Sequence, residues 1–255
     1  MLNKTQLLPD RPGIPPMAPM PEPEVVDSAW DYVCFTDKAG QDGVWKLREI
    51  PYASANPILR ARYAKLHPHL LLPEYELSVF MDANLCITGE AFYEHISALE
   101  NASMALLEHP SRDCVYEELR YCYLKDKLST RAAWGLLRSY KQMAMPRHFG
   151  LYETNVVLRH HRDVAVVALD KQWWRLLEAS RCTRDQLSLT PALHLEGLQP
   201  ALLLGRGLNA RNVPYIRYSN HPRTGKENVP GRLNWANLTY NLRLAWRKCN
   251  LLWLR

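Results

Sequence analysis

The 255-residue sequence has no long hydrophobic run. Its longest uninterrupted apolar stretch is Val164 to Leu169, whereas a membrane-spanning helix needs about 20 such residues. The first residues, MLNKTQLLPDRPGIPP, lack the basic start and the apolar core of a secretory signal. We therefore expect no segment that crosses a bilayer and a location in the cytoplasm, with the inner face of a membrane as an alternative place.

The six cysteines include no C-x-x-C pair. They are scattered among apolar residues, which is typical of reduced core cysteines and not of structural zinc ligands. The sequence also lacks G-x-G-x-x-G, G-x-x-x-x-G-K-[ST], G-x-S-x-G and H-E-x-x-H patterns. A Rossmann dehydrogenase, a P-loop NTPase, an α/β-hydrolase and a zincin are therefore left without motif support.

The sequence does contain enough apolar residues for a substantial core. Hydrophobic residues make up 47% and charged residues 23%, with a mean hydropathy of −0.32. These proportions exclude wholesale disorder and a collagen-like fibre. The length fits one large domain, or one domain with appendages, in a soluble globular protein.

Positive charge is concentrated near the end of the chain. Residues 206–255 hold ten Lys and Arg against the single acid Glu227, a net charge of +9, while the other residues hold 22 basic and 25 acidic side chains, a net charge of −3. Tyrosines and tryptophans are interspersed with these cations. The mixture suits phosphates and bases or an anionic membrane surface, and a solvated basic face is the ordinary alternative. We expect no specific nucleic-acid partner.

An amphipathic helix is predicted for residues 233–255. Its apolar residues recur at steps of three or four and form one stripe: Trp235, Leu238, Leu242, Trp246, Cys249 and Trp253. Docking on the chain's own domain is the commonest use of such a stripe. Peripheral membrane contact and a nucleic-acid arm are the alternatives.

Three regions are predicted along the chain. Residues 1–27 contain seven of the 18 prolines and little periodic apolar content, so they indicate a flexible, extended leader. Residues 28–205 form the main domain, and residues 206–255 form a basic aromatic segment.

Short apolar strands alternate with helices in the main domain. We expect strands over 32–35, 44–50, 77–81, 102–107 and 154–158, and helices over 57–66, 90–100, 115–128, 130–143 and 171–179, with a further helix beginning near 183. This alternation predicts an α/β sheet flanked by helices. Ligands of such sheets collect at the carboxyl ends of strands, so polar residues directly after strands are the first candidates for a site.

The strand over 77–81 is followed by Asp82-Ala83-Asn84. In an extended chain Asp82 and Asn84 would point the same way and offer two oxygen ligands to one ion. Mg²⁺ and Mn²⁺ favour such oxygens and can bridge to a substrate diphosphate. The alternative interpretation is an ordinary turn after a strand, where Asp and Asn are common.

Other polar clusters are candidates at the remaining elements. Arg62 and Lys65 are three apart and share a helix face, so they could hold a phosphate pair. Arg112 follows the strand over 102–107 and could contact a sugar or an acceptor. Glu153 precedes the next strand, and Asp185 begins a helix, where its charge also suits the helix dipole.

The joint order of these motifs resembles one family. The matching segments are Cys34-Phe35-Thr36-Asp37, Arg62-Tyr63-x-Lys65-Leu66-x-Pro68-His69, Pro73-x-Tyr75-x-x-Ser78-x-x-Met81-Asp82-Ala83-Asn84, His109-Pro110-x-Arg112-Asp113-Cys114-x-Tyr116-Glu117-Glu118, Leu151-Tyr152-Glu153-Thr154-Asn155-Val156-Val157-Leu158-Arg159 and Ser180-Arg181-x-x-Arg184-Asp185-Gln186-Leu187-Ser188. Over about residues 31–190 the sequence resembles a glycosyltransferase-like domain family related to plant mucilage-polysaccharide hexosyltransferases and bacterial surface-polysaccharide proteins.

This resemblance implies a GT-A-like nucleotide-sugar fold in which an Asp-x-Asp motif binds a divalent metal, Mn²⁺ or Mg²⁺, and the donor diphosphate. Here the second carboxylate is the amide of Asn84, and a neutral ligand weakens binding of a hard cation. A late histidine often completes the metal site in the GT-A pattern, which makes His221 the candidate third ligand.

The resemblance also implies roles for single residues. Residues expected near the donor are Thr36, Asp37, Arg62, Lys65, Arg112 and Arg184. Asp185 and Gln186 are expected near the transferred sugar or acceptor, with Asp185 the leading carboxylate for sugar positioning or base work and Glu153 the second.

The function expected from the sequence is transfer of a hexose from a nucleotide diphosphate sugar to a glycan or polysaccharide acceptor. Two alternatives remain open at this point. The chain could be a catalytically silent subunit that binds a nucleotide sugar or glycan during polysaccharide assembly, or a nucleic-acid-binding protein that uses its basic segment.

Overall fold

The computed structural model describes residues 2–5, 21–180, 182–219 and 247. His221 and the predicted helix of residues 233–255, Arg247 excepted, lie outside these residues. Arg247 contacts the end of α4 (Val115–Leu124) and the connection after it: its guanidinium lies 4.7 Å from the centre of the Tyr123 ring and donates to Leu128 O at 3.0 Å. The predicted helix of residues 233–255 therefore stays untested, although Arg247 contacts the main domain.

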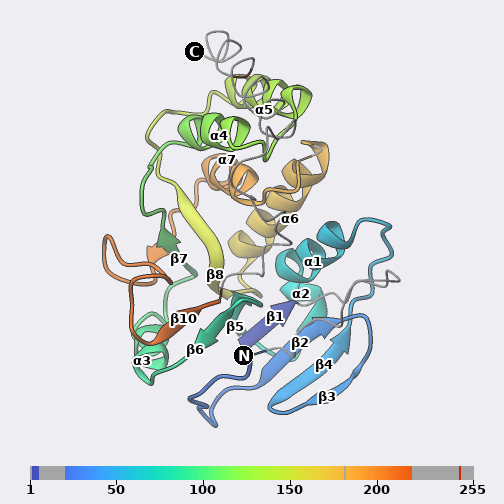
Figure 1. The fold of residues 1–255 in the computed structure, drawn as a ribbon, viewed down its shortest axis with the longest axis vertical. Helices are drawn as coiled ribbons and strands as arrows, with labels where there is room; N and C mark the ends of the chain where they lie inside the picture. Colours follow the sequence, from blue (N-terminus) through green and yellow to red (C-terminus); the bar gives the residue numbers. More distant parts are fainter. Residues whose placement is uncertain (1, 6–20, 181, 220–246, 248–255) are drawn as a thin grey trace, which may run out of the picture.

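An eight-stranded mixed sheet forms the centre of the fold (Figure 1). Its strands, in spatial order, are β3 (Gly40–Asp42), β4 (Trp45–Glu49), β2 (Tyr32–Thr36), β1 (Leu2–Thr5), β5 (Leu77–Asp82), β8 (Tyr152–His160), β7 (Met104–Glu108) and β9 (Ala201–Leu202). The neighbours β4, β2, β1 and β5 are parallel, and β8 runs antiparallel to both β5 and β7. A small antiparallel sheet pairs β6 (Leu85–Ile87) with β10 (Ile216–Tyr218).

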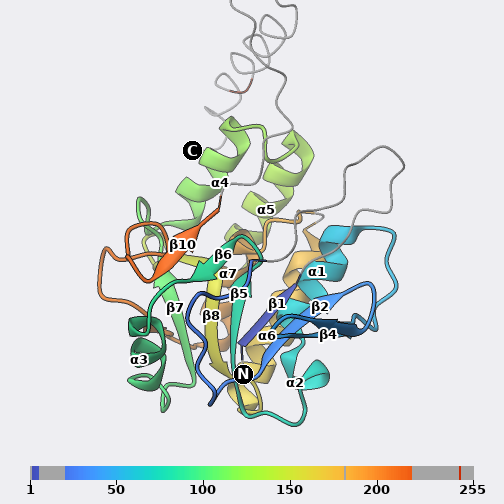
Figure 2. The same ribbon diagram turned by 60° about the horizontal axis from the view of Figure 1, so that its bottom comes forward.

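Helices cover the sheet on both faces. They are α1 (Pro57–Leu66), α2 (Pro68–Leu71), α3 (Ala91–Ser97), α4, α5 (Thr130–Gln142), α6 (Val164–Ala179) and α7 (Gln186–Glu196). Helices α1, α6 and α7 contribute to one core cluster, whereas α3 and the small sheet contribute to the cluster on the opposite face. Figures 1 and 2 show α4 and α5 together at one end of the molecule. The predicted α/β sheet flanked by helices is confirmed.

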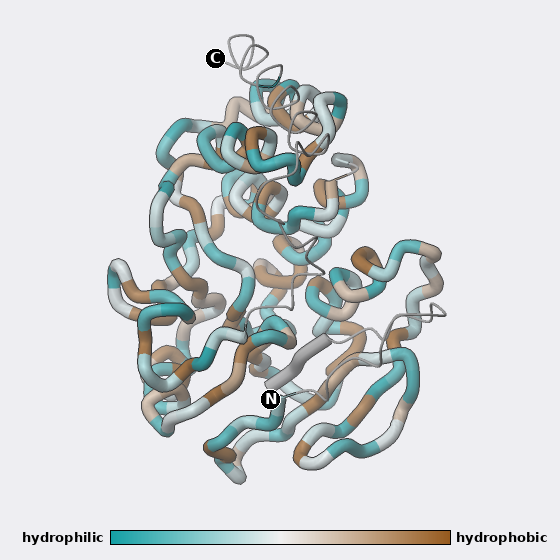
Figure 3. Tube along the Cα trace, viewed as in Figure 1, coloured by the Kyte–Doolittle hydropathy of each residue, from teal (hydrophilic) through white to brown (hydrophobic). Residues whose placement is uncertain are grey.

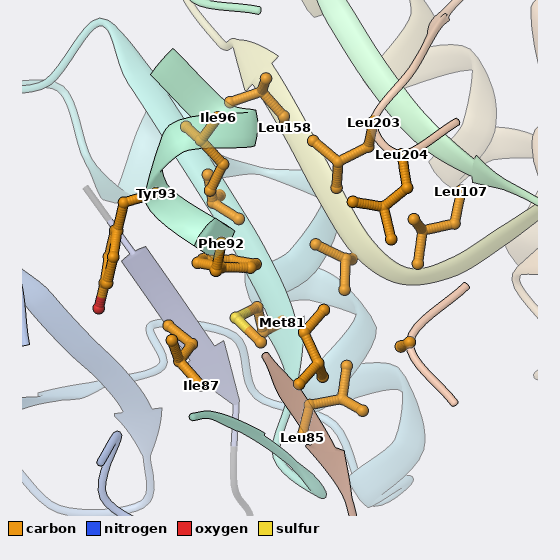
Figure 4. Packing of buried hydrophobic residues seen from close by; sticks show 14 of the residues in the cluster. Met81, Leu85, Ile87, Phe92, Tyr93, Ile96, Leu107, Leu158, Leu203 and Leu204 are labelled. Carbon is orange, nitrogen blue, oxygen red and sulfur yellow. The ribbon is translucent and has the colours of Figure 1, made fainter. Parts of the chain in front are cut away.

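The two-residue period of the strands decides which side chains enter which core. Val79 and Met81 of β5 belong to the cluster that contains α3, and Phe80 between them belongs to the cluster that contains α6 and α7. Figure 4 shows Met81 packed near Phe92 of α3. Because β5 is apolar on both faces, it must be covered on both, as is usual for parallel strands.

Helices α4 and α5 have a core of their own. Leu119 and Tyr123 of α4 pack with Leu136 and Tyr140 of α5. Figure 3 shows hydrophilic and hydrophobic segments alternating along this pair, the pattern of helices with one buried face. Within the described residues, none of the helices has the length and apolar character that a bilayer-spanning helix requires.

Local signals explain where the helices begin. The Asn56 side chain accepts from the Ile58 N–H at 3.0 Å and caps α1, with Pro57 in its first turn. Asp163 accepts from the Ala165 N–H at 2.8 Å and starts α6 at Val164. The prediction began this helix at residue 171 and was wrong by two turns, since the apolar run from Val164 is the first part of α6.

The structure differs from the predicted regions at both ends. Residues 2–5 do not lie in a flexible leader: they form β1, which pairs with β2 and β5 in the middle of the sheet. Residues 216–218 of the predicted basic segment form β10 against β6. The rest of the leader before residue 21 and most of the segment after residue 219 lie outside the described residues, so the domain boundaries stay predictions.

Candidate functional site

Polar side chains gather at one edge of the large sheet. The parallel strands end there, with Thr36 at the end of β2, Asp82 at the end of β5 and Glu108 at the end of β7. The antiparallel strand β8 begins at the same edge, because Glu108 pairs with Tyr152 and Met81 with Val156. The topology therefore brings polar residues at the strand ends to one edge of the sheet, as expected.

Lys65 lies at the centre of this edge. Its side chain is completely buried, its Nζ is 2.6 Å from Asp185 Oδ2, and it donates a further hydrogen bond to the Thr154 carbonyl. Asp82 Oδ1 lies 4.0 Å away. Burial lowers the pKa of Lys65, while the carboxylates of Asp185 and Asp82 oppose that effect. A buried ammonium held this way has its position fixed by several partners.

Asp185 is the carboxylate that holds the cluster together. It precedes α7 and is only 5% exposed. Its second oxygen, Oδ1, is 3.2 Å from Arg62 Nη2, so one carboxylate binds two cations. Burial alone would raise the pKa of Asp185, but Arg62 and Lys65 outweigh burial and hold that pKa well below its usual range. Asp185 is therefore a firm anion and a weak base.

A second buried ion pair lies beneath Lys65. Arg159 of β8 and Asp170 of α6 are both completely buried, with Nη1 and Oδ1 2.8 Å apart. The Arg159 guanidinium also donates to the Lys65 carbonyl. Burial raises the pKa of Asp170 to about 6, although Arg159 opposes the shift. This pair fixes the last turn of α1 and with it the backbone from which the Lys65 side chain extends.

Thr36 and Asp37 lie at the end of β2. Thr36 is buried, and Asp37 Oδ1 is 2.6 Å from Arg60 Nη1. Arg60 comes from the same helix, α1, as Arg62 and Lys65. Helix α1 thus carries three cations along this edge, each paired with a carboxylate from another element.

Glu153 and Gln186 lie on either side of the start of β8. Glu153 is buried and forms an ion pair with Arg211 Nη1, while the Arg211 guanidinium lies 4.8 Å from the centre of the Tyr218 ring. Gln186 Nε2 donates to the Tyr152 carbonyl at 3.0 Å. Both candidates therefore lie at the edge, but each is engaged by a partner other than Lys65.

Asp82 and Asn84 belong to a tight connection between β5 and β6. Residues 83–84 form a turn, so the expected extended chain ends at Asp82 and the premise that both side chains point the same way fails. The Asn84 carbonyl accepts from the Ser219 N–H at 2.8 Å, which ties the turn to the end of β10. The Asp82 side chain is 37% exposed. Among the described residues, no three His, Cys, Asp or Glu side chains are grouped so that they could hold a metal ion by themselves.

Two candidate residues lie apart from the Lys65 cluster. Arg112 pairs with Glu118 of α4 at 2.7 Å and lies 4.1 Å from the centre of the Tyr121 ring. The Arg184 backbone N–H donates to Cys182 Sγ at 3.4 Å. Neither guanidinium forms an ion pair with a described carboxylate of the Lys65 cluster, although Arg184 is the chain neighbour of Asp185.

Sequence reasoning missed Arg159 and Asp170 as a pair, and Arg211 as the partner of Glu153. One signal for the pair was available, since Arg159 ends an apolar strand and Asp170 interrupts an apolar helix. A charge inside an apolar element is usually buried with a partner. No comparable signal distinguishes Arg211 from the other cations of the basic segment.

Comparisons with known proteins show what this chain is similar to. The sequence model described as TOD1/MUCI70, glycosyltransferase-like domain, matches residues 31–196. The apo structure of the WbbM bifunctional glycosyltransferase superposes on 67% of this chain and 32% of its own, with 13% identity and a TM-score of 0.42. Mouse xyloside xylosyltransferase 1 in its apo form superposes on 65% and 68%, with 14% identity and a TM-score of 0.32. This chain spans about a third of the WbbM chain, and the search of curated proteins gives no match.

Proposed function

The chain belongs to the TOD1/MUCI70 glycosyltransferase-like domain family, and from this premise we propose that it transfers a hexose from a nucleotide diphosphate sugar to a hydroxyl of a glycan or polysaccharide, on a GT-A-like fold. The observation that carries the proposal is the fixed pair of cations, Arg62 and Lys65, at the carboxyl edge of the parallel strands. Such an edge is where α/β sheets bind nucleotides, and guanidinium and ammonium groups suit phosphate oxygens.

The charge balance of the edge favours a divalent cation as a cofactor. Arg60, Arg62 and Lys65 supply three positive charges, and three carboxylates, those of Asp37, Asp82 and Asp185, already accompany them. A nucleotide diphosphate adds further negative charge to a site without a cationic excess. Mn²⁺ or Mg²⁺ bound with the diphosphate would offset that charge.

The residues present fit such a cation. Mg²⁺ is usually held by one or two carboxylates together with substrate phosphates, so the partly exposed Asp82 carboxylate is a sufficient protein contribution. His221 is the proposed further ligand. When bound, the cation would stabilise the diphosphate as it leaves.

Residues of the chain itself would bind the diphosphate, position the sugar and accept the proton of the acceptor. In the transfer the acceptor oxygen forms a bond to the anomeric carbon, the bond from that carbon to the diphosphate oxygen breaks, and its electron pair leaves with the diphosphate. The partly exposed Arg62 would contact and orient the diphosphate, and the buried Lys65 would stabilise the developing negative charge through its positive charge and hold Asp185 in place. Because Asp185 is a weak base, we assign it with Gln186 to positioning the sugar. Glu153 is the candidate base for the acceptor proton.

The direct test is a donor screen with the purified protein in Mn²⁺ or Mg²⁺. UDP- and GDP-sugars are followed by thermal shift and by slow hydrolysis, and CMP-sugars serve as a control with a single phosphate. We expect at least one diphosphate donor to raise the melting temperature, and EDTA or Asp82→Ala to abolish the effect. If CMP-sugars act as well as the diphosphate donors, the assignment of Arg62 and Lys65 to a diphosphate is wrong.

Asn84 favours a second candidate function. An amide in place of a carboxylate weakens the metal site, and a chain that binds a donor without turning it over would be a silent subunit of polysaccharide assembly. Stabilisation by a donor without hydrolysis, and without transfer to any glycan, distinguishes this function from the enzyme. Membrane contact through residues 233–255 is a further proposal, tested by vesicle flotation with and without that segment. A cytoplasmic location is another, tested by cell fractionation.

A further inference from the structure

A cavity of about 450 Å³ opens at the carboxyl end of β7. Its volume lies within the range of about 300–1,000 Å³ that is usual for small-molecule sites. Its charged lining residues are Glu108, Arg112, Asp113, Glu117 and Arg206, and His109 and Tyr152 line it as well. They come from the end of β7, the start of α4, the start of β8 and the loop after β9, so four separate parts of the chain converge on one hollow.

The walls of the cavity are tied to one another by backbone hydrogen bonds. The His109 N–H donates to the Leu151 carbonyl at 2.9 Å, and the Gly150 N–H donates to the Asp113 carbonyl at 3.0 Å. Gly150 has a φ of 112°, a conformation that other residues rarely adopt. The segment that leads into β8 is therefore shaped to form this wall.

The same wall continues into the Lys65 cluster. Tyr152 lines the cavity and accepts, through its carbonyl, the hydrogen bond from Gln186. Two residues further along β8, the Thr154 carbonyl accepts from Lys65. A ligand in the cavity would thus lie beside the groups that we assign to the donor, separated from them by the first residues of β8.

The charges of the cavity select against a phosphate. Three carboxylates, Glu108, Asp113 and Glu117, line it with two arginines, and Arg112 is already paired with Glu118. Burial and the neighbouring Arg112 lower the pKa of His109, so its imidazole is neutral at neutral pH. A ligand here should be uncharged and rich in groups that both donate and accept hydrogen bonds.

We propose that this cavity binds a neutral saccharide, as the acceptor of the transfer reaction. The inference rests on the proposed function and adds to it the place and the chemical class of the acceptor. Glu108 and Glu117 form no ion pair with any described residue and can accept hydrogen bonds from sugar hydroxyls, while Arg206 can donate to sugar oxygens. The donor half has three cations for three carboxylates, whereas this cavity has three carboxylates for two arginines. This difference in charge separates an acceptor half from a donor half of the same edge.

The test uses methyl glycosides of common neutral hexoses as probes, with the full chain labelled with ¹⁵N. Binding is followed by saturation transfer to the sugar and by shifts of the Gly150 and Leu151 amides. We expect at least one glycoside to bind at millimolar concentration and to shift these amides. Glu108→Gln with Glu117→Gln should weaken binding by roughly tenfold, because hydrogen bonds to charged groups are lost. The matched control is Glu94→Gln on α3, which removes one exposed carboxylate outside the cavity and should leave binding unchanged.

The proposal is overturned if glycosides shift amides elsewhere and not those of the cavity, if they bind equally well to the variant with Glu108→Gln and Glu117→Gln, or if they fail to bind while UDP with Mn²⁺ stabilises the protein. In the third case the proposed donor site is supported, and only the assignment of the cavity to the acceptor is wrong. If UDP shifts the cavity amides, the cavity belongs to the donor and the division into two halves fails. If neither glycosides nor nucleotides bind, both the proposed function and this inference fall.

Discussion

Two aspartates of this protein, Asp185 and Asp170, are buried beside cations, yet their pKa values are shifted in opposite directions. Asp185 faces both Arg62 and Lys65, and its pKa is held well below the usual range. Asp170 faces Arg159 alone, and its pKa is raised to about 6. One cation does not offset the cost of burying a carboxylate here, whereas two do. The firmly ionised carboxylate, Asp185, lies in the candidate site, and the carboxylate with the raised pKa, Asp170, lies in the buried ion pair that fixes the backbone of Lys65.

The largest expected effect is that of Asp185→Asn. This variant leaves the buried Lys65 ammonium without its carboxylate, so we expect the free energy of unfolding to fall by about 3–5 kcal/mol. Urea denaturation at pH 7 measures it. Asp31→Asn is the matched control. A loss no larger than in the control would show that the pairing of Lys65 and Asp185 contributes nothing to stability.

Lys65→Met sharpens the comparison, because it gives Asp185 a single arginine, the arrangement that Asp170 already has. We expect the pKa of Asp185 to rise, and stability to fall less than in Asp185→Asn, since the cation is removed and the carboxylate keeps Arg62. Carbonyl ¹³C shifts of labelled aspartate, followed against pH, report the change. An unchanged pKa would mean that the number of cations does not explain the difference between the two sites.

The pH dependence of stability tests Asp170. Its folded pKa lies above its unfolded value of about 4, so the folded state binds the proton more tightly and the contribution of Asp170 to stability falls as pH rises from about 4 to 6. Relative to Asp170→Asn, the wild type should therefore lose stability across that window and stay level above it. Urea denaturation of both proteins from pH 4 to 7 gives this difference, in which the titration of groups that do not interact with Asp170 cancels. A difference that is independent of pH would contradict the raised pKa.

The smallest effect is expected at the surface. Asp31 pairs with Lys46, but both side chains are well exposed, and such pairs contribute less than about 1 kcal/mol. Asp31→Asn should leave the free energy of unfolding nearly unchanged, because the amide oxygen can still accept the hydrogen bond that the Tyr75 hydroxyl donates to Asp31 at 2.8 Å, and added salt should remove the contribution of the ion pair. A loss comparable to that of Asp185→Asn would mean that burial is not what separates the two pairs.

Local patterns predicted much of the sheet and part of the site. Arg62 and Lys65 were candidates because they share a helix face, and the resemblance to a glycosyltransferase-like family added Asp185 and assigned the roles of all three. The topology brings them to one edge of the sheet. Their mutual contacts could not be read from the sequence, since Lys65 and Asp185 are 120 positions apart. The turn at residues 83–84 was one of the two interpretations of Asp82-Ala83-Asn84.

The sequence could not indicate β1. Leu-Asn-Lys-Thr has neither an apolar run nor an alternation over enough residues to signal a strand, and prolines crowd the positions that follow. Its place comes from pairing with β2 and β5, which is a long-range property of the fold. Tertiary context of this kind regularly overrides local propensity.

The most direct test of the account is the affinity of the protein for UDP and GDP in the presence of Mn²⁺, measured by titration calorimetry for the wild type and Lys65→Met. If the buried cations at this edge hold a diphosphate, at least one nucleotide binds the wild type, and Lys65→Met, folded by its circular dichroism, weakens that binding by at least roughly tenfold, or about 1.4 kcal/mol. Equal affinities for the two proteins would contradict the assignment of Lys65 to the donor site.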